Sequence, residues 1–307
     1  MHDQLDLGRP RVSLNLGGGG TRGLSHIGVL KALHEYKIEF DIIIGVSMGA
    51  IMGLNYALNP DPEALEKKIG EHLKSEKFKD TLLGSWKKID ADRGKSILTK
   101  INQLVKKTGL VGRLLLTKGV LSDEDVEDAL FPLIPDVSFS DLKKQFICIA
   151  VNLKTGLPQV FNEGKVRDAV LASASMPLVF PPVNIKGTHY ADGGILDKIG
   201  IDTAMAAGVK KILAVDPSNS SIVDRKISSA LDVMIIADDI ASMYRKSDQL
   251  KDATVVISPI DQDIHWADYS SFDKLIEVGY RKTVESIPEI MKKIKPRRKG
   301  FFSFFRK

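Results

Sequence analysis

The feature that most constrains the fold of this chain is a pair of strand, glycine-turn and helix units near its N-terminus. RVSLNL (11–16) is an apolar, β-rich run that leads into the glycine turn GGGGTRG (17–23) and a helical pattern at 23–37. DIIIG (41–45) leads into GVSMGA and a second helical pattern at 48–58. Consecutive units of this kind favour parallel strands of one sheet, whose carboxyl-terminal turns are neighbours. We therefore expect the two glycine-containing turns to lie side by side.

Apolar β-rich runs and helical patterns continue to alternate along the chain. The further strands are expected at 145–152, 158–161, 188–191, 211–216 and 253–258, and the further helices at 165–173, 200–208, 226–250 and 271–294. This alternation predicts an α/β fold of three layers, α/β/α, with a mostly parallel central sheet. Residues from about 60 to 140 are rich in Lys and Glu and contain no clear strand, which indicates a helical insertion. We expect one domain over residues 1–291, followed by a tail over 292–307.

Composition limits the class of protein. With 43% hydrophobic and 27% charged residues, the chain has the composition of a soluble globular protein. No stretch reaches the roughly 18 uninterrupted apolar residues of a membrane span, and the first residues lack the apolar run of a secretory signal. The only cysteine, Cys148, lies in the apolar run FICIAV, so no intrachain disulfide forms, which fits a reducing compartment. These features predict a cytoplasmic protein.

The excess positive charge is confined to the C-terminal tail. Residues 292–307 hold eight Lys or Arg and no acid, so a total of +5 minus 8 leaves a net charge of −3 on the rest of the chain. Four phenylalanines lie between these cations: Phe301, Phe302, Phe304 and Phe305. The mildly acidic body argues against nucleic acid as a partner. The tail predicts peripheral association with an anionic membrane surface, with a solvated end or a nucleic-acid contact as the alternative.

The glycine turn matches a dinucleotide-binding motif, but its surroundings do not. Gly18, Gly20 and Gly23 fit the pattern G-x-G-x-x-G, in which backbone N–H groups approach a pyrophosphate. That function also needs an acid after the second strand to hold a ribose. The available acids, Glu39 and Asp41, precede the strand IIIG and so lie at the opposite edge of the sheet from a bound ligand. We therefore disfavour an NAD-dependent oxidoreductase and predict no cofactor.

The turn after the second strand carries a candidate nucleophile. Gly45–Gly49 form G-x-S-x-G between a strand and a helix, which is the context of a nucleophile elbow. Such a sharp turn strains Ser47 and exposes its hydroxyl, while the N–H of Met48 begins the helix and points toward an oxygen beside Ser47. The N–H groups of Gly19 and Gly20 in the neighbouring turn are further candidate donors to an oxyanion. Together these residues predict a serine nucleophile with an oxyanion hole.

A serine hydroxyl needs a base to take its proton, and two candidates exist. His265, in DIHWADYS, follows Ser47 and Asp192 in the order Ser, Asp, His that α/β-hydrolases use. Asp192, in GTHYADGGIL, is itself a candidate base, although Asp-Gly is also typical of a hairpin turn. The residues alone leave these alternatives open.

Five blocks in order resemble one known family. GGGGTRG, LSHIGVLKAL, GVSMGA, RDAVLASASMPLVFPPV and ADGG, spread over roughly residues 11–258, resemble the patatin-like phospholipase family. The resemblance implies a patatin-like fold and a dyad in place of a triad. In that dyad Ser47 attacks an acyl ester carbonyl and Asp192 serves as the general base. A carboxylate hydrogen-bonded to the serine can perform both proton transfers, so this cycle does not need a histidine.

The resemblance also implies the substrate and its surroundings. Gly18, Gly19 and Gly20 would form the oxyanion hole, with Arg22 close by as a substrate-binding positive charge. The substrates would be fatty acyl esters of phospholipids or lysophospholipids, cleaved without a metal. The sequence contains neither a His-Glu zinc motif nor a calcium loop.

One departure and one alternative accompany this interpretation. After ADGG the family usually continues with Asn and, a few residues on, Pro, where this chain has Asp197 and Gly200. We therefore expect a differently shaped loop behind Asp192. The alternative is a protein without catalytic activity, a lipid-binding or regulatory module on the same fold. One fold can serve several unrelated functions, so the fold alone does not establish the activity.

Overall fold

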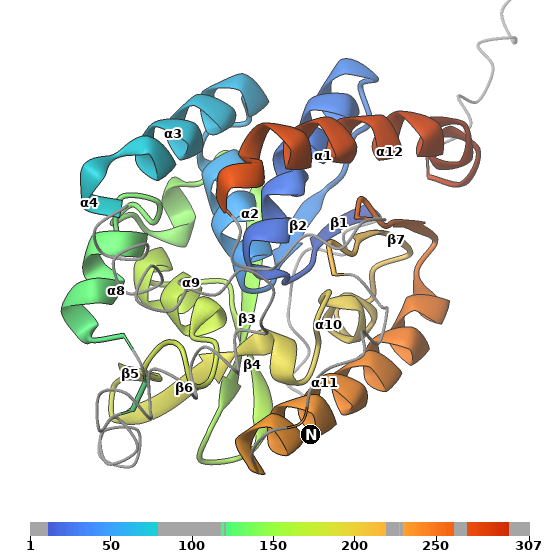
Figure 1. Cartoon of the computed structure of the whole chain (residues 1–307). Helices are drawn as coiled ribbons and strands as arrows, with labels where there is room; N and C mark the ends of the chain where they lie inside the picture. The colour runs from blue at the N-terminus through green and yellow to red at the C-terminus, as the bar shows by residue number, and fades with distance from the viewer. Residues whose placement is uncertain are drawn as a thin grey trace, which may run out of the picture.

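The structure is a computed structural model that describes residues 12–78, 118–119, 121–218, 227, 230–260 and 269–294. Its described strands form one sheet with helices on both faces (Figure 1). The strands are β1 (Val12–Leu16), β2 (Ile42–Gly45), β3 (Gln145–Asn152), β4 (Leu157–Phe161), β5 (Val183–Ile185), β6 (Thr188–Asp192), β7 (Lys211–Val215) and β8 (Val255–Ile257). The α-helices are α1 (Ser25–Glu35), α2 (Met48–Leu58), α3 (Pro62–Lys74), α4 (Glu76–Phe78), α8 (Asp123–Leu130), α9 (Val166–Ala174), α10 (Ile201–Ala206), α11 (Ala230–Gln249) and α12 (Phe272–Lys293). The predicted three-layer α/β/α class is confirmed.

The sheet is parallel through its centre and antiparallel at one edge. Its strand order is β5-β6-β3-β2-β1-β7-β8, and β4 also pairs with β3. The neighbours from β3 through β2, β1 and β7 to β8 are all parallel. The pairs β3·β4, β3·β6 and β5·β6 are antiparallel. The carboxyl ends of five strands therefore share one edge, which is where sheets of this class bind ligands.

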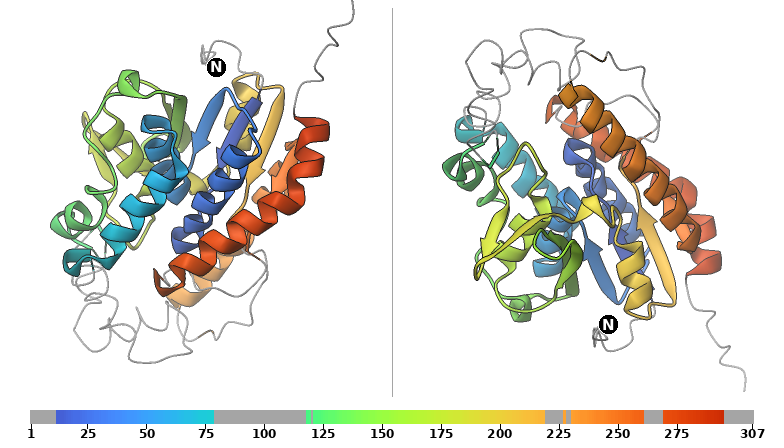
Figure 2. Two further views of the ribbon diagram at one scale, coloured as in Figure 1. Left: turned by 90° about the horizontal axis from the view of Figure 1, so that it is seen from above. Right: turned by 90° about the horizontal axis from the view of Figure 1, so that it is seen from below.

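Two hydrophobic cores lie on the two faces of the sheet. Side chains alternate along each strand, so Ile43 of β2 faces one core while Ile42 and Ile44 face the other. The larger core lies under α1, α2, α9 and α12, and the smaller one lies under α10. Figure 2 shows α1 and α12 on one side of the sheet and α10 and α11 on the other. Because both faces are covered, the central strands read as continuous apolar runs.

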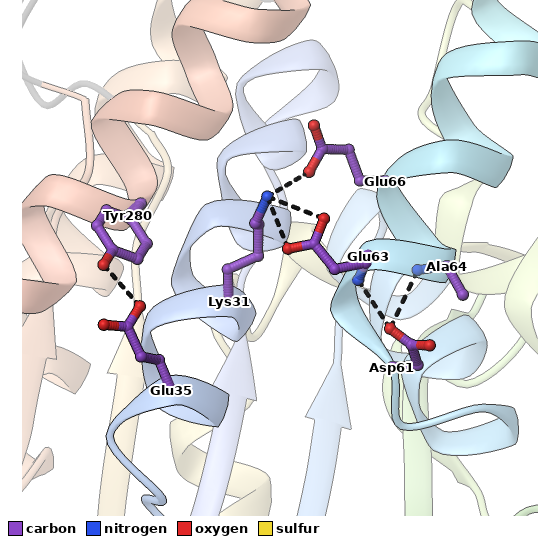
Figure 3. Close-up of polar contacts among 7 residues, drawn as sticks. All are labelled: Lys31, Glu35, Asp61, Glu63, Ala64, Glu66 and Tyr280. Carbon is purple, nitrogen blue, oxygen red and sulfur yellow. Dashed lines mark hydrogen bonds and ion pairs between the residues drawn. The ribbon is translucent and has the colours of Figure 1, made fainter.

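Polar contacts join α1 to its neighbours at the surface (Figure 3). The ammonium of Lys31 pairs with Glu66 at 2.7 Å and with Glu63 at 3.0 Å, both on α3. The hydroxyl of Tyr280 on α12 donates to Glu35 at the end of α1 at 2.7 Å. Exposed contacts of this kind add little free energy, so apolar packing holds these helices and the polar contacts only orient them.

The strands and helices expected from the sequence are confirmed within the described residues, and one strand was missed. The short strand β5 was not expected because three residues give too little periodicity to recognise. In the expected insertion, α3, α4 and α8 are helical, whereas residues 79–117 and 120 lie outside the described part. His265 and residues 295–307 of the tail also lie outside it. Among the described helices, none has the length and apolar character needed to cross a bilayer.

Candidate active site

The two turns expected to be neighbours are adjacent in the structure. β1 and β2 pair in parallel with Leu16 opposite Gly45, the last residue of each strand. The backbone N–H of Val46 continues this pairing and donates to the carbonyl of Leu16 at 3.0 Å. The glycine turn after β1 and the elbow after β2 therefore leave the sheet at the same edge and at the same height.

Ser47 has the strained backbone of a nucleophile elbow. Its φ of 55° and ψ of −124° lie outside the regions that L-residues normally adopt, and it immediately precedes α2. Close backbone packing holds it there. A Cβ on Gly45 would lie 2.5 Å from the Cα of Ala50, and a Cβ on Gly49 would lie 2.0 Å from the carbonyl oxygen of Leu16. Both glycines are required because the turn is pressed against its own helix and against β1.

The antiparallel edge brings Asp192 to the same height as Ser47. Gly45 of β2 lies opposite Cys148 of β3, and Ala150, two residues further along β3, lies opposite Asp192. Asp192 ends β6, and its carboxylate interacts with the side chain of Ser47. Residues that are 145 positions apart in the sequence thus meet at the sheet edge.

The carboxylate of Asp192 is buried but retains polar partners. The residue as a whole is 6% exposed. Its Oδ1 accepts from the N–H of Gly194 at 2.7 Å. Burial raises the pKa of Asp192 from 3.8 to about 6, while the bonds from Ser47 and Gly194 and the charge of Lys198 act in the opposite direction. A carboxylate whose pKa lies near neutrality is suited to accept and return a proton.

The candidate oxyanion donors differ in whether their N–H group already makes a hydrogen bond within the described residues. In the described part of the chain, no hydrogen bond is found from the N–H of Gly19 or from that of Met48, the first residue of α2. Gly20 begins a 3₁₀ turn with a φ of 58°. The N–H of Gly18, by contrast, already donates to the carbonyl of Lys198 at 3.0 Å.

Gly18 therefore needs a correction to its expected role. With its N–H occupied, it does not serve as an oxyanion donor in this structure. Its glycine character matters for space, because a Cβ there would lie 3.1 Å from the Cβ of Ser47. The remaining candidate donors are Gly19, Gly20 and Met48. Arg22 lies in the 3₁₀ helix Gly20–Leu24 that follows the turn.

Three buried polar residues hold the backbone around the candidate site and were not recognised from the sequence. The hydroxyl of Ser173, on α9, accepts from the backbone N–H of Ser47 at 3.1 Å. The Nε2 of His26 lies 2.8 Å from the carbonyl of Gly17. The side-chain amide of Asn15, within β1, donates to the carbonyl of Gly200 at 2.7 Å. Each is a polar residue inside an apolar run, which is a signal for a buried hydrogen-bonding role.

His26 is held in its neutral form. Burial lowers its pKa from 6.5 to about 4, and the bond to Gly17 and the charge of Asp216 only partly oppose this. The neutral ring donates from Nε2 to the carbonyl of Gly17, so Nδ1 carries no proton. Nδ1 is buried and has no hydrogen-bond partner within the described residues. The histidine therefore braces the glycine turn.

The departure from the family pattern after ADGG has a physical explanation. Gly200 has a φ of 75°, a left-handed conformation that proline does not adopt. Asp197 accepts from the N–H groups of Ile201 and Thr203 and from the hydroxyl of Thr203, each at 3.0 Å. This chain therefore turns into α10 with a glycine and a capping carboxylate. Among the described residues, no group of three or more His, Cys, Asp or Glu is arranged to hold a metal ion.

A strained serine and a buried carboxylate lie at the carboxyl edge of an α/β sheet, which is the geometry of a nucleophile elbow. The sequence model of one family, described as patatin-like phospholipase, matches residues 14–205. The match covers more than half of the chain, so the chain belongs to the patatin-like phospholipase family. The predicted family is thereby confirmed.

The chain is also similar to parts of several longer proteins. The chain is 28% identical over 205 residues to the lysophospholipase nte1 of Aspergillus fumigatus, covering 67% of this chain and 12% of that protein. It is 30% identical over 206 residues to an uncharacterized NTE family protein of Mycobacterium bovis, covering 67% and 48%. The chain thus matches only a part of these relatives. Among solved structures, VipD from Legionella pneumophila aligns with a TM-score of 0.47 and 16% identity, over 91% of this chain and 67% of that one.

Proposed function

We propose that this protein is a serine lipid acyl hydrolase of the phospholipase A or lysophospholipase type, which cleaves fatty acyl esters of phospholipids through a dyad of Ser47 and Asp192. The observation that carries the proposal is the pairing of a strained serine with a buried carboxylate whose pKa is raised to about 6. Membership of the patatin-like phospholipase family supports the lipid ester as the substrate class.

The proposed first half-reaction forms an acyl-enzyme. The Oγ of Ser47 attacks the ester carbonyl, and Asp192 takes the hydroxyl proton. Negative charge develops on the carbonyl oxygen, where the N–H groups of Gly19, Gly20 and Met48 would stabilise it. The carbon–oxygen bond to the glycerol then breaks, and Asp192 returns the proton to the departing oxygen. The fatty acyl group remains on Ser47.

The proposed second half-reaction releases the fatty acid. Asp192, again ionised, takes a proton from a water molecule that attacks the acyl-enzyme carbonyl. The same donors stabilise the second oxyanion, the bond to Oγ breaks, and Asp192 returns the proton to Ser47. Both half-reactions require Asp192 to be ionised before the attack. With a pKa of about 6, its carboxylate is mostly ionised at pH 7.

Loss of either dyad side chain tests the proposal. We expect Ser47→Ala and Asp192→Asn each to lower kcat/KM for a soluble short-chain ester and for phospholipid vesicles on the order of 10⁴-fold or more, as removal of a nucleophile or base does elsewhere. Ser175→Ala is the matched control, because within the described residues its hydroxyl donates to the carbonyl of Leu171 and to no other group. Folding is checked by circular dichroism. Wild-type activity in purified Ser47→Ala would falsify the assignment.

A fluorophosphonate probe separates a hydrolase from a non-catalytic lipid-binding module. The Oγ of Ser47 attacks phosphorus, fluoride leaves and Asp192 takes the proton, so only an activated serine is labelled. We expect one label on the wild-type protein, mapped to Ser47 by peptide mass spectrometry, and none on Ser47→Ala. Binding of phospholipid vesicles without any label would favour the binding module.

The proposal includes peripheral association with an anionic membrane surface through residues 292–307. Basic and aromatic residues together favour the interface between headgroups and acyl chains. Removal of residues 295–307 leaves α12 (Phe272–Lys293) intact and should weaken sedimentation with phosphatidylglycerol vesicles while sparing turnover of a soluble ester. Replacing only the four tail phenylalanines by serine keeps the charge and measures the aromatic share. Undiminished vesicle binding after the truncation would refute this part.

A further inference from the structure

The loop behind the candidate base is held by a helix from a distant part of the sequence. Residues 193–200, called here the base loop, connect Asp192 at the end of β6 to α10. From α11, Arg245 donates to the carbonyl of Ile195 at 2.9 Å, and Gln249 donates to that of Leu196 at 3.3 Å. The position of Asp192 therefore depends on contacts that the ADGG motif does not contain.

A buried ion pair anchors α11 to the sheet. Lys246 of α11 pairs with Asp216 at 2.8 Å, and each side chain is only 3% exposed. Asp216 directly follows β7, so the pair lies at the same carboxyl edge as the two glycine-containing turns. Lys246 also donates to the hydroxyl of Ser218 at 2.9 Å. A buried ion pair of this kind holds α11 in one position relative to the sheet. Separating the two partners would leave two buried charges uncompensated, which is costly in free energy.

Lys198 of the base loop contacts both halves of the site. Its carbonyl accepts from the N–H of Gly18 at 3.0 Å, which links the base loop to the glycine turn. Its side-chain stem and the carboxylate of Asp192 both lie near Gly194. A Cβ added to Gly194 would lie 3.0 Å from Oδ1 of Asp192 and 3.9 Å from Cγ of Lys198. Its ammonium lies 3.4 Å from the hydroxyl of Ser242 on α11.

The charges around the Lys198 ammonium come from several elements. Burial and the charge of Lys246 lower the pKa of Lys198, while Asp239, Asp216 and Asp192 raise it. Toward Asp192, the charge of Lys198 acts in favour of the ionised carboxylate, against burial. The three carboxylates thus help to keep the ammonium charged, and the ammonium helps to keep the candidate base charged.

We infer that Lys198 is a positioning residue of the active site, whose carbonyl joins the base loop to the glycine turn and whose ammonium keeps Asp192 ionised. The inference rests on the proposed function of Asp192 as the base. Without the ammonium, a buried carboxylate shifts toward its protonated form, which cannot accept the proton of Ser47. Lys198 therefore extends the activity of the dyad to lower pH.

The test replaces the ammonium and keeps the main-chain bond. Lys198→Met removes the charge with a similar stem, and Lys198→Arg retains the charge. The readout is the rate at which a fluorophosphonate labels Ser47 between pH 5 and 9, together with kcat/KM for a soluble short-chain ester. We expect the acid limb of both profiles to move up by about one pH unit in Lys198→Met, the lower end of the effect of a nearby charge. Lys198→Arg should restore the wild-type limb.

The outcomes separate this inference from the proposed function. If wild-type Ser47 is neither labelled nor active toward any ester, the proposed function fails. If labelling occurs and the acid limb is the same in wild type and in a folded Lys198→Met, the inference alone is overturned. Lys198→Gln provides a second uncharged variant should Lys198→Met not fold. A uniform loss of rate at every pH, with an unmoved acid limb, would also overturn the inference.

Discussion

The nucleophile and the base of the candidate site are positioned by different kinds of contact. On the nucleophile side, backbone presses directly on backbone, so that Gly45 and Gly49 have no room for a side chain. On the base side, Asp192 lies at the antiparallel edge, and side chains of α11 hold the base loop that follows it. The first arrangement is rigid and local. The second is polar and assembled from distant segments, so its charge state and position can be tuned.

The largest expected difference between the nucleophile side and the base side is in how much a Gly→Ala substitution destabilises the protein. In Gly49→Ala the new Cβ would meet the carbonyl oxygen of Leu16 at 2.0 Å. We expect a loss of more than about 3 kcal/mol in the free energy of unfolding, because two backbones must separate. Urea unfolding at pH 7 measures it.

Gly194→Ala is the matched substitution on the base side. Its Cβ would lie 3.0 Å from Oδ1 of Asp192, so the carboxylate must move by a few tenths of an ångström. We expect a stability loss below about 1 kcal/mol, typical of small adjustments, and a clear fall in kcat. Equal destabilisation by Gly49→Ala and Gly194→Ala would remove the contrast between the two sides.

The second prediction concerns the instability that the buried base imposes. Folding raises the pKa of Asp192 from 3.8 to about 6, so the folded state binds the proton more tightly than the unfolded state. The stabilising effect of that proton is complete below pH 3.8 and is lost as the pH rises through about 6. Asp192→Asn should therefore be more stable than wild type by about 2 to 3 kcal/mol at pH 7.5, and by about half as much at pH 5.

Chemical denaturation of wild type and Asp192→Asn at both pH values checks this prediction. An inactive variant that is more stable than wild type at pH 7.5 would mean that the buried carboxylate serves activity at the expense of stability. A variant less stable than wild type at pH 7.5 would instead mean that the carboxylate has a structural role.

The nucleophile side could be predicted from the sequence because its determinants are local. A strand, a glycine turn and a helix follow one another in each of the first two units, and parallel neighbours place both turns at one edge. The pairing of Leu16 with Gly45 confirms that expectation. The strain at Ser47 follows from the same short segment. No long-range contact had to be known.

The base side could be predicted only in part. ADGG marked Asp192 as a candidate, but its height beside Ser47 depends on the antiparallel pairing of β6 with β3, which no local pattern specifies. The bond from Gly18 to Lys198 likewise joins segments 180 residues apart, and it changed the expected set of oxyanion donors. Ser173 contacts Ser47 from a helix whose sequence predicts only its apolar face. Such contacts are tertiary, so local periodicity does not predict them.

The third prediction uses the opposite pH response of the nucleophile side. Folding lowers the pKa of His26 from 6.5 to about 4, so the unfolded state binds the proton more tightly. Stability from this group is complete above pH 6.5 and is lost as the pH falls toward 4. Between pH 7.5 and 5 this amounts to a loss of about 2 kcal/mol, which His26→Gln should lack.

The measurement is the difference in unfolding free energy between pH 7.5 and pH 5, taken within each variant. This difference is insensitive to any constant loss of packing at position 26. Acid should therefore act on the two sides with opposite sign, weakening the fold through His26 and strengthening it through Asp192. An unchanged difference in His26→Gln would show that the histidine does not carry the acid response.

The smallest expected effect is at the side-chain bond from Ser173 that supports the elbow. Ser173→Ala leaves the N–H of Ser47 without its acceptor at 3.1 Å. An unsatisfied donor that is only partly buried costs about 1 kcal/mol, so kcat/KM for a soluble ester should fall about 5-fold if that energy goes into misplacing Ser47. Ser175→Ala removes a hydroxyl that, in the part of the chain described, bonds to Leu171 alone, and it should stay near wild type. A Ser173→Ala variant with full activity would mean that glycine packing alone holds the elbow, which would make the contrast between the two sides sharper.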